Sequence, residues 1–258
     1  MKEEKACSPP KVSVIMPAYN AASTILESID SVFAQTYHNW ELIIVDDCSF
    51  DFTNEIALRA TVTDSRIRLI KNDKNMGVAS SRNISISLAQ GDWLAFLDSD
   101  DMWLPEKLER QLDFAKKTNA AITYTATAYI DTNGKKKKYI LPAEYKLQLK
   151  DLLRRNIMTC SSVLVKKEYM QPFPPGFLHE DYATWIEIVK KTGCAYGLNE
   201  PLTMYRISET SKSYNRIKSA KMNFNAYRYV GYNMFLAVCF SAFYAVHSVS
   251  KRCKIRLS

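Results

Sequence analysis

The acidic stretch Asp98-Ser99-Asp100 offers the clearest chemistry in this sequence of 258 residues. It follows an apolar run at residues 93–97, which has the length and composition of a buried strand. Two carboxylates spaced two residues apart at a strand end can bind a hard cation together, directly or through water. Mg²⁺ or Mn²⁺ held there could bridge to a diphosphate and neutralise it as a leaving group. Acidic triplets are also common in solvated turns. The residues around the stretch are therefore needed to distinguish a metal site from a solvated turn.

Polar clusters end two other apolar runs. Tyr19-Asn20 comes after the run at 12–16, and Asp46-Asp47 comes after the run at 41–45. In open parallel sheets, ligands bind beyond the carboxyl ends of the strands. These two clusters and the acidic stretch therefore point to one edge of a sheet.

The helical segment before the acidic stretch begins with Gly77 and contains Arg82. Glycine permits close approach of a backbone, and arginine can balance the charge of a phosphate. Taken singly, Gly77 is an ordinary first residue of a helix, Arg82 is surface charge, and Asp47 is a turn or cap residue. Their occurrence together favours a ligand that contains phosphate.

Strands and helices are expected to alternate along the first half of the chain. A fourth apolar run lies at 66–70. Helical patterns at 22–34 and 77–89 follow the runs at 12–16 and 66–70, and a third at 104–117 follows the acidic stretch. This alternation predicts parallel β-α-β units and an α/β fold.

The second half is less regular, without an internal repeat or a long linker. We expect it to pack against the first sheet. Its expected elements are strands at 121–130 and 139–141 around a lysine-rich hairpin tip, a helix at 147–155, an extended segment at 162–165, a helix at 181–191, and strands at 194–198 and 202–206.

The formal net charge of +8 is concentrated in two short runs. A nucleic-acid-binding surface would be expected to combine a basic stripe with aromatic side chains that stack on bases. Outside the two runs the chain is nearly neutral, so no nucleic-acid partner is expected. The runs are Lys135 to Lys138, and the C-terminal Lys251, Arg252, Lys254 and Arg256.

The six cysteines are scattered, with no CxxC pair and no spacing typical of zinc sites. Reduced thiols in a cytoplasmic protein explain this usage best. The first ten residues, MKEEKACSPP, lack the apolar core of a secretory signal.

Five ordered motifs resemble the family 2 glycosyltransferases, which have the GT-A fold. They are VSVIMPAYN, SVFAQTY, WELIIVDDCS, NMGVASSRN and GDWLAFLDSDDMWLPEKLERQ. The later FLHEDYATWIEIVKK, AYGLNEPLTMYRIS and SKS look most like bacterial teichuronic-acid, O-antigen and capsule glycosyltransferases. The resemblance implies a GT-A domain over 11–215, with a nucleotide-sugar half at 11–118 and an acceptor half at 119–215, and a C-terminal helical segment at 216–258.

The resemblance also implies a reaction: transfer of a sugar from a UDP-sugar to a glycan or a polyprenyl-diphosphate-linked acceptor, with inversion and with Mn²⁺ or Mg²⁺. Its nucleotide-sugar and metal positions fall on residues already singled out above or next to them. Pro17, Ala18, Tyr19 and Asp47 match positions that hold the uracil and ribose, and Arg82 matches a phosphate-side arginine. Asp98 matches the nucleotide-side aspartate, next to Ser99 in the nucleotide-sugar site, and Asp98 and Asp100 would hold the metal.

Two carboxylates, Glu180 and Asp181, compete for the role of general base. Direct displacement needs a base for the acceptor hydroxyl and charge stabilisation for the departing UDP. The resemblance favours Asp181, although an acidic pair also suits the first turn of any helix. On the acceptor or diphosphate side it adds His179, Arg206 and Ser208, while Trp185 could stack on a sugar ring or pack in the core.

Two departures from the family matter. Ser208 stands where many relatives carry a histidine, which argues against a protein metal ligand beyond Asp98 and Asp100. The QxxRW motif of processive members is missing, so we expect one sugar to be added per encounter.

Residues 229–250 contain no charged side chain and are flanked by Lys and Arg. The stretch just reaches the length of a membrane span. Its apolar residues gather on one side of a helix and its polar residues on the other, which favours a helix lying in the interface of an anionic membrane. Packing on the domain, packing on a second subunit of a homo-oligomer, and a true span remain alternatives. We expect a cytoplasmic protein at the inner face of the cytoplasmic membrane.

Two other functional classes fit less well. A non-catalytic nucleotide-sugar-binding module would not need Asp98, Asp100 and Asp181 together. A nucleotidyltransferase or dehydrogenase on a similar sheet would be expected to have a glycine-rich phosphate loop. The first β-α turn lacks GxGxxG, and the chain has only seven glycines.

Overall fold

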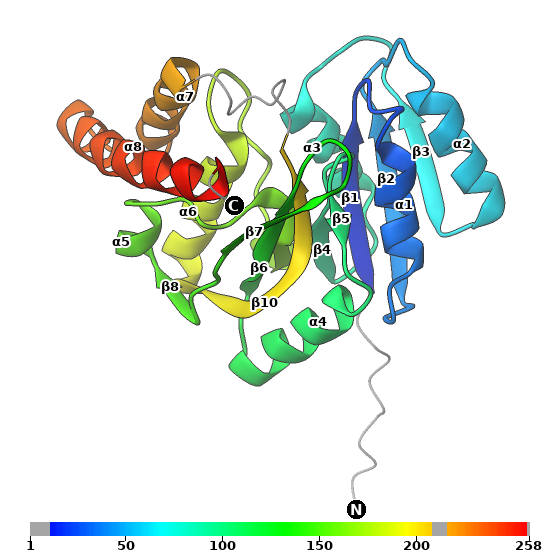
Figure 1. The fold of residues 1–258 in the computed structure, drawn as a ribbon, viewed down its shortest axis with the longest axis horizontal. Coiled ribbons are helices and arrows are strands. Elements are labelled where there is room, and N and C mark those ends of the chain that lie inside the picture. The colour runs from blue at the N-terminus through cyan, green and yellow to red at the C-terminus, as the bar shows by residue number, and fades with distance from the viewer. Residues whose placement is uncertain (1–10, 208–215, 257–258) are drawn as a thin grey trace, which may run out of the picture.

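A computed structural model describes residues 11–207 and 216–256 of the chain. Within these residues, ten strands form one mixed sheet with helices on both faces (Figure 1). The strands are β1 (Val12–Ala18), β2 (Trp40–Asp46), β3 (Ile67–Lys71), β4 (Trp93–Phe96), β5 (Met102–Trp103), β6 (Ile122–Ile130), β7 (Lys136–Leu141), β8 (Lys146–Gln148), β9 (Val163–Lys166) and β10 (Cys194–Arg206).

The strand order is β3-β2-β1-β4-β9-β6-β10-β5, with β7 paired to β6 and β8 paired to β10. The first four strands in this order are parallel, as the sequence predicts. β9 runs antiparallel to both of its neighbours, β4 and β6, and β10 runs parallel to β6. The carboxyl ends of β1, β2, β4, β6 and β10 therefore all lie at one edge of the sheet.

The helices pack on the two faces of this sheet. α1 (Ile25–Phe33), α2 (Thr53–Thr63) and α4 (Lys107–Thr118) bury their apolar sides on one face, and α3 (Val78–Leu88), α6 (Glu180–Thr192) and α7 (Arg216–Tyr229) bury theirs on the other. The remaining helical elements are α5 (Leu149–Leu152), α8 (Met234–Arg256) and the short 3-10 turns η1 (Cys160–Ser162) and η2 (Lys167–Tyr169).

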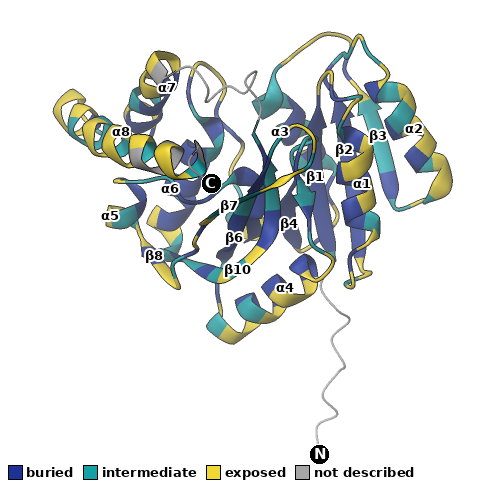
Figure 2. Cartoon of the chain, viewed as in Figure 1, coloured by how far each residue is buried: buried dark blue, intermediate teal, exposed yellow. Residues whose placement is uncertain are grey.

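Alternation along β1 explains why the sheet is covered on both sides. Val12, Val14 and Met16 belong to the core under α1 and α2, whereas Ile15 belongs to the core under α6. All four side chains are fully buried. Successive side chains of a strand point to opposite faces, so a strand with apolar residues at both alternating positions requires a layer on each side. Figure 2 shows the resulting buried interior of the sheet.

Several predicted boundaries differ from the structure. α2 was not expected. The segment predicted as a helix at 147–155 starts as β8 and contains only the short α5, and the two strands expected near the C-terminal end of the sheet form the single strand β10. The predicted lysine-rich hairpin exists, but its turn lies at Asp131–Gly134, where the amide N of Gly134 donates to the carbonyl O of Asp131 at 3.0 Å. The lysines begin β7.

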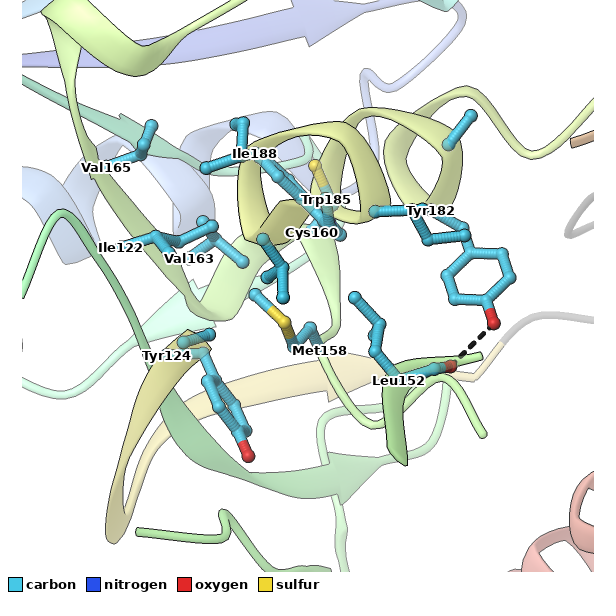
Figure 3. Packing of buried hydrophobic residues seen from close by; sticks show 14 of the residues in the cluster. Ile122, Tyr124, Leu152, Met158, Cys160, Val163, Val165, Tyr182, Trp185 and Ile188 are labelled. Atoms are coloured by element: carbon cyan, nitrogen blue, oxygen red, sulfur yellow. Dashed lines mark hydrogen bonds between the residues drawn. The ribbon is translucent and has the colours of Figure 1, made fainter. Parts of the chain in front are cut away.

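Trp185 is a core residue, and the possibility that it stacks on a sugar ring is wrong. Its side chain is fully buried in α6, among apolar residues of the sheet and of η1 (Figure 3). The ring centroids of Phe96 and Phe173 lie 5.3 and 5.9 Å from that of Trp185, both edge-on. A ring enclosed by two other aromatic rings has no free face for a ligand.

Candidate active site

A cavity of about 1170 Å³ opens at the sheet edge where the parallel strands end. Its walls come from the ends of β1, β2, β4 and β10, from the first turns of α3 and α6, and from the last turns of α8. Among the residues predicted for the site, the cavity wall includes Pro17, Ala18, Tyr19, Asp47, Arg82, Asp98, Ser99, Asp100, His179, Glu180, Asp181 and Arg206. Ser208 lies outside the described residues.

The acidic loop after β4 presents Asp98 and Asp100 to this cavity. Both side chains are half-buried. Burial and the nearby Asp98 carboxylate raise the pKa of Asp100 to about 6. A cation next to Asp100 would offset this effect and stabilise its ionised form. The pair therefore fits a divalent metal ion that a diphosphate would help to coordinate.

Asp101, which no sequence pattern singles out, anchors the acidic loop. One of its carboxylate oxygens accepts the hydroxyl of Ser161 in η1, and the other accepts the backbone N–H of Arg206 at 2.9 Å. The Ser161 hydroxyl oxygen in turn accepts the backbone N–H of Asp98 at 3.1 Å. Burial, with Asp100 and Asp98 nearby, raises the pKa of Asp101 well above its ordinary value. These hydrogen bonds fix the buried side of the loop, and Asp98 and Asp100 are left facing the cavity.

Arg82 of α3 lies between two carboxylates that come from distant parts of the chain. Its Nη2 is 2.6 Å from Oδ1 of Asp98, and its Nη1 is 2.9 Å from Oε1 of Glu180. The side chain is only 4% exposed, and its guanidinium carbon lies 5.2 Å from the ring centroid of Phe173. Arg82 therefore joins the acidic loop to α6. In the described residues its Nε has no hydrogen-bond partner.

Glu180 and Asp181 open α6, but the structure gives them different surroundings. Glu180 is buried and paired with Arg82. Asp181 is half-buried at the cavity wall, where its Oδ1 accepts the backbone N–H of Tyr182 at 2.7 Å. Burial and the neighbouring Glu180 raise the pKa of Asp181. Of the two carboxylates, Asp181 is the better suited to accept a proton.

An aromatic pair lies beyond the ends of β1 and β2. Tyr19 follows β1, is 45% exposed, and meets the ring of Phe50 edge-on with centroids 6.4 Å apart. Hydrogen bonds between Asn20 and the loop of Phe50 tie the two strand ends together: the Phe50 amide donates to Asn20 Oδ1 at 2.9 Å. Phe50 was missed because an exposed aromatic residue in a loop carries no pattern of its own.

Asp47 is buried at the end of β2 and accepts three N–H groups. Its Oδ1 accepts the side-chain amide of Asn72 and the backbone N–H of Met76, both at 2.8 Å, and its Oδ2 accepts the N–H of Gly77 at 2.7 Å. Gly77 has a φ of +85°, a conformation that glycine adopts without strain. Asp47 thus fixes the loop that leads into α3, and one acceptor position remains on Oδ2.

Arg206 and His179 are held by protein partners. The Arg206 side chain pairs with Glu27 of α1, and its Nε donates to the carbonyl O of Asp100 at 2.8 Å. His179 Nε2 lies 3.0 Å from the hydroxyl of Ser219 in α7. Both residues brace the site: Arg206 supports the acidic loop, and His179 links the start of α6 to α7.

The metal-binding groups supplied by the protein are few. Within residues 11–207 and 216–256, no cluster of three or more His, Cys, Asp or Glu side chains is arranged to hold a metal ion. Asp98 and Asp100 would form only a partial ligand set, which would suit a metal that shares its coordination with a diphosphate.

The sequence profile of the family described as "Glycosyl transferase family 2" matches residues 13–170, more than half of the chain. The chain belongs to this family. As a family 2 glycosyltransferase it is 37% identical over 247 residues to TuaG of Bacillus subtilis, described as "Putative teichuronic acid biosynthesis glycosyltransferase", covering 94% of this chain and 98% of TuaG. It is 39% identical over 212 residues to WfgD of Escherichia coli, a UDP-Glc:alpha-D-GlcNAc-diphosphoundecaprenol beta-1,3-glucosyltransferase, covering 81% of this chain and 82% of WfgD.

Solved structures of other glycosyltransferases share the fold. TarS of S. aureus (residues 1–349), in complex with UDP-GlcNAc, superposes with a TM-score of 0.71 at 19% identity, covering 90% of this chain and 70% of that structure. The mannosyltransferase PcManGT of Pyrobaculum calidifontis, in complex with GDP-Man and Mn²⁺, gives 0.70 at 18% identity, covering 95% and 76%. The expected GT-A fold with C-terminal helices is thereby confirmed for this family 2 enzyme.

Proposed function

We propose that this glycosyltransferase transfers a sugar from a UDP-sugar to a hydroxyl of a lipid-linked surface-polysaccharide precursor, with inversion and with Mg²⁺ or Mn²⁺. The observation that carries the proposal is the placement of Asp181 on the wall of the same cavity as Asp98 and Asp100. A base and a diphosphate-binding group on separate elements can lie on opposite sides of a bound sugar, as direct displacement requires.

The donor assignment rests on the aromatic pair and on the relatives. Tyr19 and Phe50 offer exposed rings against which a uracil can stack. WfgD is named for UDP-Glc, and TarS binds UDP-GlcNAc. Of the relatives named above, only WfgD supports the acceptor assignment, because its name gives a GlcNAc-diphosphoundecaprenol acceptor.

In the proposed reaction, Asp181 takes the proton of the acceptor hydroxyl, whose oxygen forms the new bond to the anomeric carbon. The bond from that carbon to the diphosphate breaks, and UDP leaves. Asp98 and Asp100 would hold a metal ion, which would supply positive charge to the diphosphate. Arg82 holds Asp98 in place and keeps Glu180 paired, so that Asp181 is left to act as the base.

Release of UDP tests this proposal. The protein is incubated with UDP-Glc, UDP-GlcNAc or GDP-mannose, with and without a GlcNAc-diphosphate lipid acceptor, and with Mn²⁺, Mg²⁺ or excess chelator. We expect acceptor-dependent release of UDP that the chelator abolishes, and a product of inverted anomeric configuration. Asp100→Asn should lose metal-dependent donor binding while its unfolding curve stays close to wild type. Full activity in chelator, or a retained configuration, would contradict the proposed mechanism.

A further inference from the structure

One apolar side of the long helix α8 faces away from the rest of the protein. Phe235, Val238, Ala242, Val246 and Val249 recur at spacings of three or four residues and form one stripe along the helix, here called the outward stripe. Its large side chains are strongly exposed, from 47% for Val249 to 75% for Phe235 (Figure 2). A helix on the surface of a soluble protein normally turns its apolar stripe to the core. The outward stripe is therefore the reverse of the usual arrangement.

The opposite side of α8 is already occupied by the protein. Ala237 is fully buried, the Phe240 ring lies 5.5 Å from that of Tyr227, and the Tyr244 ring lies 5.9 Å from that of Tyr182. By length and composition, α8 is the one helix within the described residues that could cross a membrane. Spanning would require it to give up these contacts. The packing instead holds α8 along the surface, beside α7 (Figure 1).

The charge around α8 indicates which partner covers the outward stripe. Residues 210–258 contain nine Lys or Arg and no Asp or Glu, so the rest of the chain carries a formal charge close to zero. Basic residues next to an apolar face favour an anionic lipid surface. A second copy of the chain would bring the same basic, acid-free region to the interface, where like charges repel.

We propose that α8 docks the protein on an anionic membrane, with the outward stripe in the interfacial layer and the helix parallel to the membrane plane. Docking has a direct consequence for access to the cavity. His247, Ser248 and Lys254 of α8 line one end of it. That end is then held next to the lipid headgroups, where a diphosphate on a lipid anchor can enter. This last step rests on the proposed function, whereas membrane docking does not.

Flotation with vesicles tests the docking of the full chain. The vesicles contain phosphatidylcholine alone or equal parts of phosphatidylcholine and phosphatidylglycerol. We expect binding to the anionic vesicles that weakens as salt is added. Phe235→Ser with Val246→Ser should lower the partition coefficient about tenfold or more, because both side chains lose apolar contact with lipid. The matched control is Leu58→Ser with Val62→Ser on α2, which removes two exposed apolar side chains elsewhere, and it should bind like wild type.

A second matched pair tests the charge. Replacing the four basic residues at 251, 252, 254 and 256 by Gln should lower binding to anionic vesicles at least tenfold, since each such residue contributes roughly a factor of five. Replacing the exposed Arg59, Lys71, Lys116 and Lys117 by Gln removes the same charge from elements that do not pack on α8, and it should have little effect. Equal losses in both variants would show a general charge effect and would overturn docking through α8.

Two further outcomes would overturn the proposal. The first is a wild-type protein that fails to bind anionic vesicles, or an outward-stripe variant that binds them as wild type does. The second is a wild-type protein that sediments as a dimer and an outward-stripe variant that sediments as a monomer, because a second copy would then cover the stripe.

Sugar transfer to a water-soluble GlcNAc-diphosphate distinguishes failure of membrane docking from failure of the proposed function. We expect the outward-stripe variant to retain that activity and to lose transfer to the vesicle-bound acceptor, whereas absence of transfer to either acceptor in wild type would contradict the function alone.

Discussion

At the scale of single residues, the buried Arg82 determines what its neighbours can do. It lies within ion-pair distance of Asp98 and of Glu180, which are 82 residues apart in the sequence. A carboxylate paired with a buried guanidinium is a poor proton acceptor, because protonation would leave the guanidinium charge uncompensated. In the proposed mechanism Glu180 is therefore a structural residue and Asp181 is the base. The residues alone leave the two adjacent acids ambiguous, and only the family resemblance favours Asp181.

Asp181→Asn should therefore lose about 100- to 10,000-fold in the transfer rate, the usual loss when a general base is removed. Asparagine keeps the size and can still accept the Tyr182 N–H, so UDP-sugar binding should stay near wild type. Calorimetry for donor binding and a UDP-release assay for turnover measure the two effects. Glu180→Gln is the comparison, and its loss should be smaller. An Asp181→Asn enzyme with wild-type turnover would exclude the assignment.

The pH profile gives an independent check on the same base. Burial and Glu180 raise the pKa of Asp181, so the acidic limb of kcat should lie above the ordinary range of aspartate. Activity should rise with pH through that limb as Asp181 loses its proton. Glu180→Gln removes the adjacent negative charge and should move the limb to lower pH. The profiles are measured at saturating metal and donor; a limb that stays in place in this variant would argue against Asp181 as the titrating group.

Tyr19 and Phe50 should stack on the nucleobase, whereas the remaining acceptor position on Asp47 Oδ2 should select uracil by accepting its N3–H. Replacing Tyr19 by Ala removes one exposed ring and should weaken UDP binding about tenfold, in line with the free energy of stacking a base on an aromatic side chain. Asp47 is a poor target for this test, because its variants would also disturb the three N–H groups that it accepts. Titration of wild type with UDP, GDP and ADP completes the experiment. Equal affinities for all three would show that this end of the cavity does not read uracil.

At the scale of elements, the sequence predicts the strands of the first half well because each is a compact apolar run that stops at a polar cluster. α2 gives no comparable signal because its buried positions are few and small, namely Thr53, Ala57 and Ala60. β10 reads as two strands because Glu200 and Pro201 interrupt it, yet β6 pairs with it on both sides of a shift in register. The contact between Asp101 and Ser161 joins positions 60 residues apart. Only the folded chain brings those two elements together.

α4 carries a lysine with no exposure to solvent. The Nζ of Lys107 donates to Gln111 Oε1 at 2.9 Å and lies 4.0 Å from the ring centroid of Trp103. Burial lowers its pKa from 10.5 to about 7. Between these pH values the folded state is neutral and the unfolded state is charged at this position, so unfolding takes up a proton. Stability should therefore rise with pH through this window, from the folded pKa to the unfolded one.

Lys107→Met should lower the slope of the free energy of unfolding against pH by ~1.4 kcal/mol per pH unit within the window, because one proton is no longer taken up on unfolding. Denaturant unfolding from pH 6 to pH 10 gives the slopes. Lys116→Met, on the same helix but exposed, is the matched control and should follow wild type. Identical slopes for wild type and Lys107→Met would mean that the buried amine stays protonated in the folded protein.

At the scale of the whole molecule, one sheet joins the two halves that the sequence suggested. β4 of the first half pairs with β9 of the second, and β9 pairs with β6. The core under α6 contains Ile15 and Phe96 from the first half together with Tyr124 and Trp185 from the second. The two cores thus correspond to the two faces of the sheet, and each face draws on both halves.

A fragment of residues 11–118 should accordingly fail to fold on its own, because it exposes the edge of β4 and half of the apolar core. The full chain should unfold in one cooperative transition. Circular dichroism and calorimetry compare the two. A fragment that melts cooperatively, or a full chain with two separate transitions, would show that the halves are independent domains.

The position of Asp47 disfavours a diphosphate at the amino end of α3, the kind of site that dinucleotide-binding proteins use for their ligand. In those proteins the ligand's pyrophosphate sits at the amino end of a helix and is stabilised by the positive end of the helix dipole. Here the protein's own carboxylate accepts the Met76 and Gly77 amides immediately before α3. A second anion at that helix end would meet this negative charge. Under the proposed function, a diphosphate in the cavity would then have to be neutralised elsewhere, and a metal ion on Asp98 and Asp100 would do this. Because Asp47 occupies the end of α3 to hold its loop, a cation taken up from solution would replace the helix dipole.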